Sequence, residues 1–301
     1  MRRMMAILLM FLSMLVHAQG HMFEAGLHAG AAGWSAEREY IGTDAGVHAG
    51  AHIHYNYISP NVIGFRTGLS LDCHNAGFGM NGYEDSYSTI DVEGQRMVID
   101  YRISSLRERY CSWSVGVPLQ LAWNIDRFTL YTGAKAVFPM TCSRRQTVEH
   151  AALSVYYPQY DNRIEDSYPL AASRDFDMSD AGTVELPPVQ WWLAFELNYA
   201  LPLRLVSRKS RQYVLVGVYF DYGLTRLTPV PSEAASLIML TDTRDGLPLQ
   251  RLLTPVMTAN RQHLPLVSSC SLFDVGIKVS YVISSYTPPR RKPQRRCTCA
   301  R

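Results

Sequence analysis

The sequence contains no apolar run long enough to span a bilayer as a helix. The longest, Met4–Val16, follows Arg2 and Arg3 and ends at the small-residue sequence Val16-His17-Ala18. A basic start, a short apolar stretch and a small-residue end are the pattern of a secretory signal peptide rather than of a membrane anchor. We therefore expect residues 1–18 to be a signal peptide, cleaved after Ala18.

The chain also lacks a strong net charge and closely spaced cysteines. It has 29 Lys and Arg against 26 Asp and Glu, so we expect no nucleic-acid partner. Of its six cysteines only Cys297 and Cys299 lie close together, which does not match a zinc ribbon or finger. For an exported chain we predict a disulfide between Cys73 and Cys111, because both flank the long connection near residues 73–105, which is predicted below to join two adjacent strands.

No Pro-, Ser- or Gly-rich linker precedes the last fifteen residues. We therefore expect one domain over residues 19–286. Prolines and like charges in the basic tail, 287–301, favour disorder there.

Beyond residue 20 the sequence has no sustained helical stripe, and apolar residues instead alternate with small or polar ones. The clearest case is Phe-Asp-Val-Gly-Ile-Lys-Val-Ser-Tyr at 273–281. Eight such segments predict an all-β chain of eight strands, at 23–31, 47–57, 63–72, 112–123, 128–138, 191–199, 213–222 and 273–281.

One face of these strands carries large aliphatic and aromatic residues, and the other carries Gly, Ala, Ser and a few charges. Small residues and paired charges fit the narrow inside of a small barrel, and large apolar residues fit lipid outside. A soluble sandwich or a lipocalin-like barrel is the alternative, and it would have an apolar inside and a polar outside.

The lengths of the connections alternate strictly along the chain. Three are short, near 59–61, 124–127 and 202–211, and four are mostly longer, near 34–42, 73–105, 141–188 and 228–265. This alternation predicts an eight-stranded antiparallel transmembrane β-barrel of the outer membrane, with long extracellular loops and both mature termini in the periplasm. Lipids, lipopolysaccharide and possible envelope proteins are then the expected partners. Within the long loops, residues 87–101 predict a hairpin around Glu93-Gly94 that extends above the membrane.

Every second residue of a strand faces the inside of the barrel, and this alternation places a set of charged residues and histidines there. Since an eight-stranded barrel has room for side chains but hardly for a channel, we expect a paired, closed network. Its predicted members are Glu24, His28, His48, His52, His54, Arg66, Asp72, Arg127, Lys135, Glu196, Asp221, Asp274 and Lys278.

The histidines raise the question of a metal site. Residues four apart on a strand are about 13 Å apart, so His48 and His52 cannot chelate one ion together. His52 and His54, about 7 Å apart, would need a ligand from another strand. We therefore predict no metal or other cofactor and interpret the histidine spacing as the period of a barrel strand.

No catalytic set stands out either. His74, His150 and His263 are expected in outer loops, with no activated nucleophile beside them. Gly77–Gly82 matches the glycine pattern of a dinucleotide-binding motif, but no helix is predicted to follow it.

The hairpin formed by Val115–Trp123 and Asn124–Ala136 resembles the PorT-like outer-membrane β-barrel proteins of Bacteroidota. The match has local specificity only over Val115–Pro139, and Gly116-Val117-Pro118 stands where the family usually has Glu-Ile-Pro. The resemblance implies a small barrel of the OmpA/OmpX type and supplies no catalytic residues.

These observations favour a structural or surface-interaction role in the cell envelope rather than an enzyme. Two alternatives stay open. One is a lipid-modifying barrel enzyme, and the other is a small specific pore or a component of secretion machinery.

Overall fold

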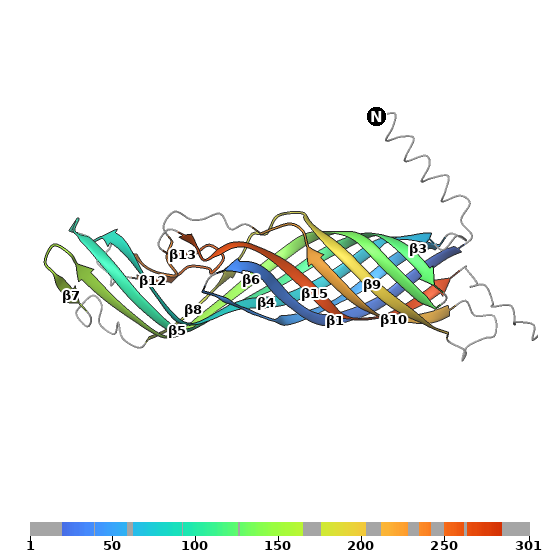
Figure 1. Ribbon diagram of the computed structural model, residues 1–301, viewed down its shortest axis with the longest axis horizontal. Coiled ribbons are helices and arrows are strands. Elements are labelled where there is room, and N and C mark those ends of the chain that lie inside the picture. The colour runs from blue at the N-terminus through green and yellow to red at the C-terminus, as the bar shows by residue number, and fades with distance from the viewer. Residues whose placement is uncertain are drawn as a thin grey trace, which may run out of the picture.

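All eight alternating segments form strands, and these pair into a closed antiparallel ring (Figure 1). The ring closes where β1 pairs with β15, from Met22 opposite Ser284 to Arg38 opposite Val267. The strands of the ring are β1 (Gly20–Arg38), β3 (Gly46–Ile58), β4 (Ile63–Ile90), β5 (Arg96–Ile125), β6 (Phe128–Tyr157), β9 (Gln190–Pro202), β10 (Gln212–Gly223) and β15 (Val267–Ser284).

This computed structural model describes residues 20–38, 40–58, 63–91, 93–125, 127–164, 176–202, 212–227, 235–241, 250–261 and 264–284. The predicted signal peptide, 1–18, and the predicted tail, 287–301, lie outside the described residues. Within them, no helix is long and apolar enough to cross a membrane.

The two faces of the ring differ as the alternation predicts. Leu27, Ile53 and Ile277 are 68%, 67% and 62% exposed on the outside, whereas Lys278 is 3% exposed on the inside. An apolar outside suits hydrocarbon, and a closed ring leaves no strand edge unpaired in lipid. The chain is therefore a transmembrane barrel of the outer-membrane type, and the soluble alternatives are excluded.

Aromatic residues mark both borders of the apolar belt. Trp113 and Trp191 lie at one end, and Phe23 and Phe128 at the other, each 45–59% exposed. On β5, Trp113 and Trp123 are separated by about 33 Å of strand, or about 25 Å along the barrel axis at the usual tilt. This height matches the apolar band of outer-membrane barrels, about 25 Å.

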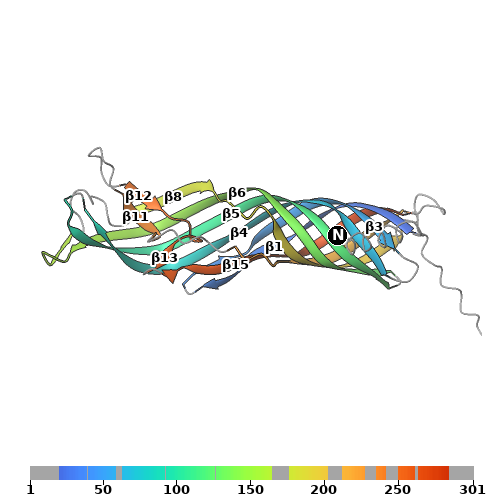
Figure 2. The same cartoon turned by 90° about the horizontal axis from the view of Figure 1, so that it is seen from above.

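The expectation of long outer loops is only partly correct, because three strands continue far past the belt. β4 has 28 residues, and β5 and β6 have 30 each. The predicted hairpin is confirmed between Ile90 and Arg96, where Gly94 has a φ of 79° and the Asp91 carboxylate accepts two backbone N–H bonds. Figure 2 shows these strands extending beyond the barrel at one end.

Further short strands and segments pack on this three-stranded extension. β7 and β8 pair with β6, and β2 pairs with β4. Two small hairpins, β11 with β12 and β13 with β14, complete the assembly. Their bounds are β2 Gly42–Asp44, β7 Asn162–Ile164, β8 Phe176–Thr183, β11 Ile238–Thr241, β12 Gln250–Leu253, β13 Asn260–Arg261 and β14 Leu264–Pro265.

The extension has its own hydrophobic core, in which Ile99, Leu237 and Val256 are fully or almost fully buried. The Tyr101 and Tyr87 hydroxyls accept backbone N–H bonds from Leu237 and Leu240, which attach the segment 235–241 to the strands. We call residues 75–111, 141–164, 176–187, 235–241 and 250–261 the extracellular module. It is a folded unit rather than a set of solvated loops.

Glycines allow close approach at the β1–β15 seam. Gly30 lies directly opposite Gly276. A Cβ on Gly30 would lie 2.1 Å from the Val275 carbonyl oxygen, and one on Gly276 would lie 2.7 Å from the Tyr219 hydroxyl. The missing side chains leave room for polar groups that point inward.

We predict that Gly30→Val destabilises ring closure by about 1–3 kcal/mol through overpacking. The folded fraction, measured by heat-modifiable migration on SDS gels, should fall. Ala31→Val is the matched control, since residue 31 is exposed on the lipid side of the same strand. Equal folded fractions for the two variants would contradict this account of the seam.

Candidate functional site

Four charged side chains form the lower part of the barrel interior. Arg66 Nη2 lies 2.6 Å from Glu24 Oε1, and Arg66 Nη1 lies 2.6 Å from Glu196 Oε2. Lys278 Nζ bridges the same two carboxylates, at 3.2 and 2.9 Å. We call Glu24, Arg66, Glu196 and Lys278 the lower ion-pair layer.

Neutral groups complete this layer. Asn56 and Ser280 donate hydrogen bonds of 3.0 and 2.8 Å to Glu24, and the Arg66 guanidinium lies 4.1 Å from the centre of the Tyr131 ring. Buried charges are tolerated when they are paired and hydrogen bonded. The layer meets both conditions.

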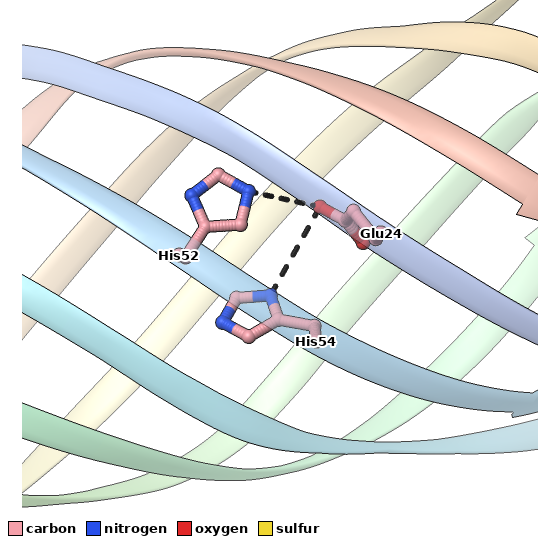
Figure 3. Close-up of side chains that lie close together, drawn as sticks. All are labelled: Glu24, His52 and His54. Carbon is pink, nitrogen blue, oxygen red and sulfur yellow. Dashed lines mark ion pairs between the residues drawn. The ribbon is translucent and has the colours of Figure 1, made fainter.

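His52 and His54, both from β3, approach Glu24 of β1 (Figure 3). The distances to Glu24 Oε1 are 3.3 Å from His52 Nε2 and 3.9 Å from His54 Nδ1. Since Arg66 and Lys278 contact the same oxygen, a metal ion there would meet two cations. This trio is best described as part of the ion-pair layer.

A second group of charged side chains and histidines lies inside the barrel, nearer its extracellular end. Lys135 Nζ lies 2.9 Å from Asp72 Oδ2 and 3.4 Å from Asp221 Oδ2. His28 Nε2 lies 2.8 Å from Asp72 Oδ1, and His48 Nδ1 lies 2.7 Å from the Tyr219 hydroxyl. We call Asp72, Lys135, Asp221, Asp274, His28, His48 and His74 the upper histidine layer.

The prediction that His74 lies in an outer loop is wrong. β4 continues without a break, so His74 shares the inward face of Asp72 and is 4% exposed. Its Nε2 lies 2.8 Å from Asp274 Oδ2. Sequence parity would have found this histidine if the strand had been extended by two residues.

The prediction for Arg127 is also wrong. β5 ends at Ile125, and Arg127 lies in the exposed turn before β6, where its guanidinium donates a 3.2 Å hydrogen bond to the Tyr199 hydroxyl. Parity does not apply in a turn. The other twelve predicted network residues line the interior, buried or nearly so.

The network fills the barrel almost completely. A cavity of about 30 Å³ remains between the two layers, lined in part by His28, Lys135, Tyr219 and Lys278. This is room for one or two water molecules. The interior therefore has the form of a polar plug.

The predicted Cys73–Cys111 disulfide is not formed in this structure, where both cysteines are free thiols. They lie on neighbouring strands in a diagonal relation, since Cys73 is opposite Trp113 and Asn75 is opposite Cys111. The pairing stays a prediction. Cys297 and Cys299 lie outside the described residues.

Glu108 is a buried carboxyl group in the extracellular module. It accepts hydrogen bonds from the Tyr110 hydroxyl and, at 2.9 Å, from the Val256 N–H, so it joins β5 to the segment 250–261. Burial raises the pKa of Glu108 to about 7. The attachment of this segment therefore depends on a group that titrates near neutrality.

Comparisons with known proteins concern only the fold. No family model and no curated protein matches the sequence. Among solved structures, the chain is similar to Ail, the attachment invasion locus protein of Yersinia pestis, at 9% identity, with 87% of this chain and 99% of that chain covered and a TM-score of 0.25. Ail in complex with the heparin analogue sucrose octasulfate is 10% identical, with 86% of this chain and 98% of that chain covered and a TM-score of 0.23. Neisserial surface protein A is 9% identical, with 87% of this chain and 96% of that chain covered and a TM-score of 0.24.

We predict that Arg66→Met destabilises the barrel by about 3–5 kcal/mol, because it leaves two buried carboxylates, Glu24 and Glu196, with Lys278 as the one base they share. The midpoint of urea unfolding, followed by tryptophan fluorescence, measures the effect. Arg102→Met is the control, since Arg102 and Glu84 are 68% and 61% exposed and such a pair contributes below about 1 kcal/mol. Similar losses in both variants would contradict the role of the lower ion-pair layer.

A second prediction concerns Glu108. Because its pKa is raised in the folded state, its contribution to stability is fully present below its unfolded pKa of 4.5 and is lost as pH rises through about 7. The module should therefore lose stability between about pH 4.5 and pH 7, by on the order of 3 kcal/mol from this group. Near-UV circular dichroism during urea unfolding measures this, and Glu108→Gln should remove that component. An unchanged pH dependence in the variant would refute the assignment.

Proposed function

We propose that this protein is a non-conducting outer-membrane barrel that anchors a folded extracellular module and contacts lipopolysaccharide through it. The observation that carries the proposal is the continuation of β4, β5 and β6 into a unit with its own core. A plugged barrel fixes the base of these strands, so the module is held rigidly above the lipid. Such a unit suits surface interaction.

The face of the module just above the belt is basic. Arg109 of β5 lies directly opposite Arg145 of β6, Arg107 lies two residues further out, and all three are exposed. Arg109 is four residues from Trp113, which places it about 10 Å above the aromatic border after allowance for strand tilt. This position is on the outer side of the aromatic border, which itself lies at headgroup level.

Directly opposed like charges destabilise a strand pair unless an anion lies between them. Among the described residues, no ion pair is formed by Arg107, Arg109 or Arg145. The planar guanidinium group binds phosphate in a bidentate manner. A phosphorylated glycolipid therefore matches this surface in charge and in position.

The alternatives have less support. A pore would need a path through the interior, where the two layers leave a cavity of only about 30 Å³. A lipid-modifying enzyme would need Ser, His and an acid together at the outer rim, yet His74, one of the histidines expected there, lies inside the barrel.

The finer assignment to PorT-like barrels of Bacteroidota rests on the hairpin 115–139 alone. The proposal of a part in secretion machinery also rests on this hairpin alone.

We predict that Arg107→Gln, Arg109→Gln and Arg145→Gln, combined, weaken binding of purified lipopolysaccharide at least tenfold at low salt, since each arginine near an anionic surface contributes about 1 kcal/mol. Titration of the folded protein in detergent, followed by microscale thermophoresis, gives the affinity. Dephosphorylated lipopolysaccharide should bind equally weakly to both proteins.

The matched control changes three exposed arginines near the tip, Arg96, Arg102 and Arg163, to Gln. It removes the same total charge and should leave the affinity within about twofold. The proposed surface would be wrong if both triple variants bound lipopolysaccharide equally well.

A further inference from the structure

We propose that the upper histidine layer binds one divalent transition-metal ion such as Zn²⁺, through His28 Nε2, His48 Nε2 and Asp72 Oδ1. Asp72 Oδ1 lies 2.8 Å from His28 Nε2 and 3.6 Å from His48 Nε2. Ligand atoms about 2.1 Å from a tetrahedral ion are about 3.4 Å from one another, so small shifts suffice. The His28 and His48 rings are inclined at 49°, and three candidate ligand atoms meet in this group within 4.8 Å.

The three ligands come from three adjacent strands. In the register, His28 of β1 lies opposite Gly50 of β3, and Gly50 lies opposite Asp72 of β4. A Cβ on Gly50 would lie 2.5 Å from His28 Nε2 and 2.7 Å from Asp72 Oδ1. The glycine therefore leaves the space over which these atoms meet.

The other polar atom of each ligand is held by a neighbour, as is usual around bound metals. Lys135 and Ser70 contact Asp72 Oδ2, at 2.9 and 2.8 Å. His48 Nδ1 is hydrogen bonded to the Tyr219 hydroxyl, while His48 Nε2 is buried and has no hydrogen-bond partner among the described residues. A buried nitrogen without a hydrogen-bond partner is unfavourable, and a bound ion would offset this cost.

A chain of hydrogen bonds fixes the protonation of His28. The single hydroxyl proton of Ser280 is donated to Glu24, so His52 Nε2 must donate to Ser280 Oγ, at 2.9 Å. In neutral His52 the other nitrogen, Nδ1, is then an acceptor, and it takes the proton of His28 Nδ1 at 3.3 Å. This leaves a lone pair on His28 Nε2 facing the Asp72 carboxylate at 2.8 Å. Only a cation or a second proton can occupy that position.

The balance of charges points to a divalent cation. In the lower ion-pair layer two carboxylates face two bases, for a sum of zero. In the upper histidine layer three carboxylates, Asp72, Asp221 and Asp274, face one base among the described residues, Lys135, which leaves a net charge of −2 before the histidines are counted. One divalent ion restores neutrality, and the alternative is protonation of two histidines.

A water molecule could reach the ion only from the side of His28. Of the three ligands, His28 alone lines the cavity of about 30 Å³ between the two layers, which has room for one water molecule. Imidazole and carboxylate ligands with a water are a common zinc set.

Two other groups of possible ligands fit less well. Glu24 with His52 and His54 already contacts Arg66 and Lys278. In the group of His48, His74 and Asp274, the two rings are stacked at 4.5 Å with only 6° between their planes, so their in-plane lone pairs do not converge.

The proposal departs from the expectation that the chain binds no metal. Distances along one strand do not reveal that His28, His48 and Asp72 lie together. The register across β1, β3 and β4 brings these three together.

The test is metal analysis of the full-length protein, purified from membranes without a histidine tag and refolded in chelator-treated buffer with zinc chloride. After removal of excess zinc, mass spectrometry of the metal should give about one zinc per chain in the wild type. His48→Gln and Gly50→Val should each reduce this at least fivefold. His54→Gln, which changes the lower layer, should retain about one zinc, and Co²⁺ in place of zinc should give visible absorption bands.

A wild type that holds less than about a tenth of an equivalent of zinc would overturn the proposal and assign the missing charge to protonated histidines. Equal zinc content in the wild type and in folded His48→Gln would also overturn it, by locating the ion elsewhere. Heat-modifiable migration verifies that each variant is folded. The wild-type measurement decides the matter if a variant fails to fold.

Discussion

The structure depends on the pairing of charges inside a closed barrel. With lipid outside, the polar face of every strand must point inward, and eight strands enclose a space only as wide as its side chains. Charges in that space are tolerated only with partners. Glu24, Arg66, Glu196 and Lys278 meet this requirement from β1, β4, β9 and β15, and so connect opposite sides of the ring.

The rest of the molecule follows from this base. Because β4, β5 and β6 continue out of the barrel without a break, the barrel fixes the position of the extracellular module. Its inner face is apolar and covered by the segments 235–241 and 250–261, while its outer face presents arginines. The same alternation that separates lipid from lumen below separates solvent from core above.

Much of the barrel could be predicted from the sequence, since a period of two decides which face each residue takes. That rule placed Asp72, Lys135 and Lys278 correctly. It failed at Arg127 and His74, because polar composition does not show where a strand ends. The contacts of the segment 250–261 with β5, and the meeting of His28 with Asp72, depend on long-range register and packing that one strand does not encode.

The central claim is that the chain is a closed barrel in an outer membrane, and the most direct measurement combines fractionation with gel migration. The account predicts recovery in the outer-membrane fraction and faster migration on SDS gels before heating than after, since a stable barrel stays folded in the detergent. Recovery as a soluble periplasmic or secreted protein, with identical migration before and after heating, would contradict it.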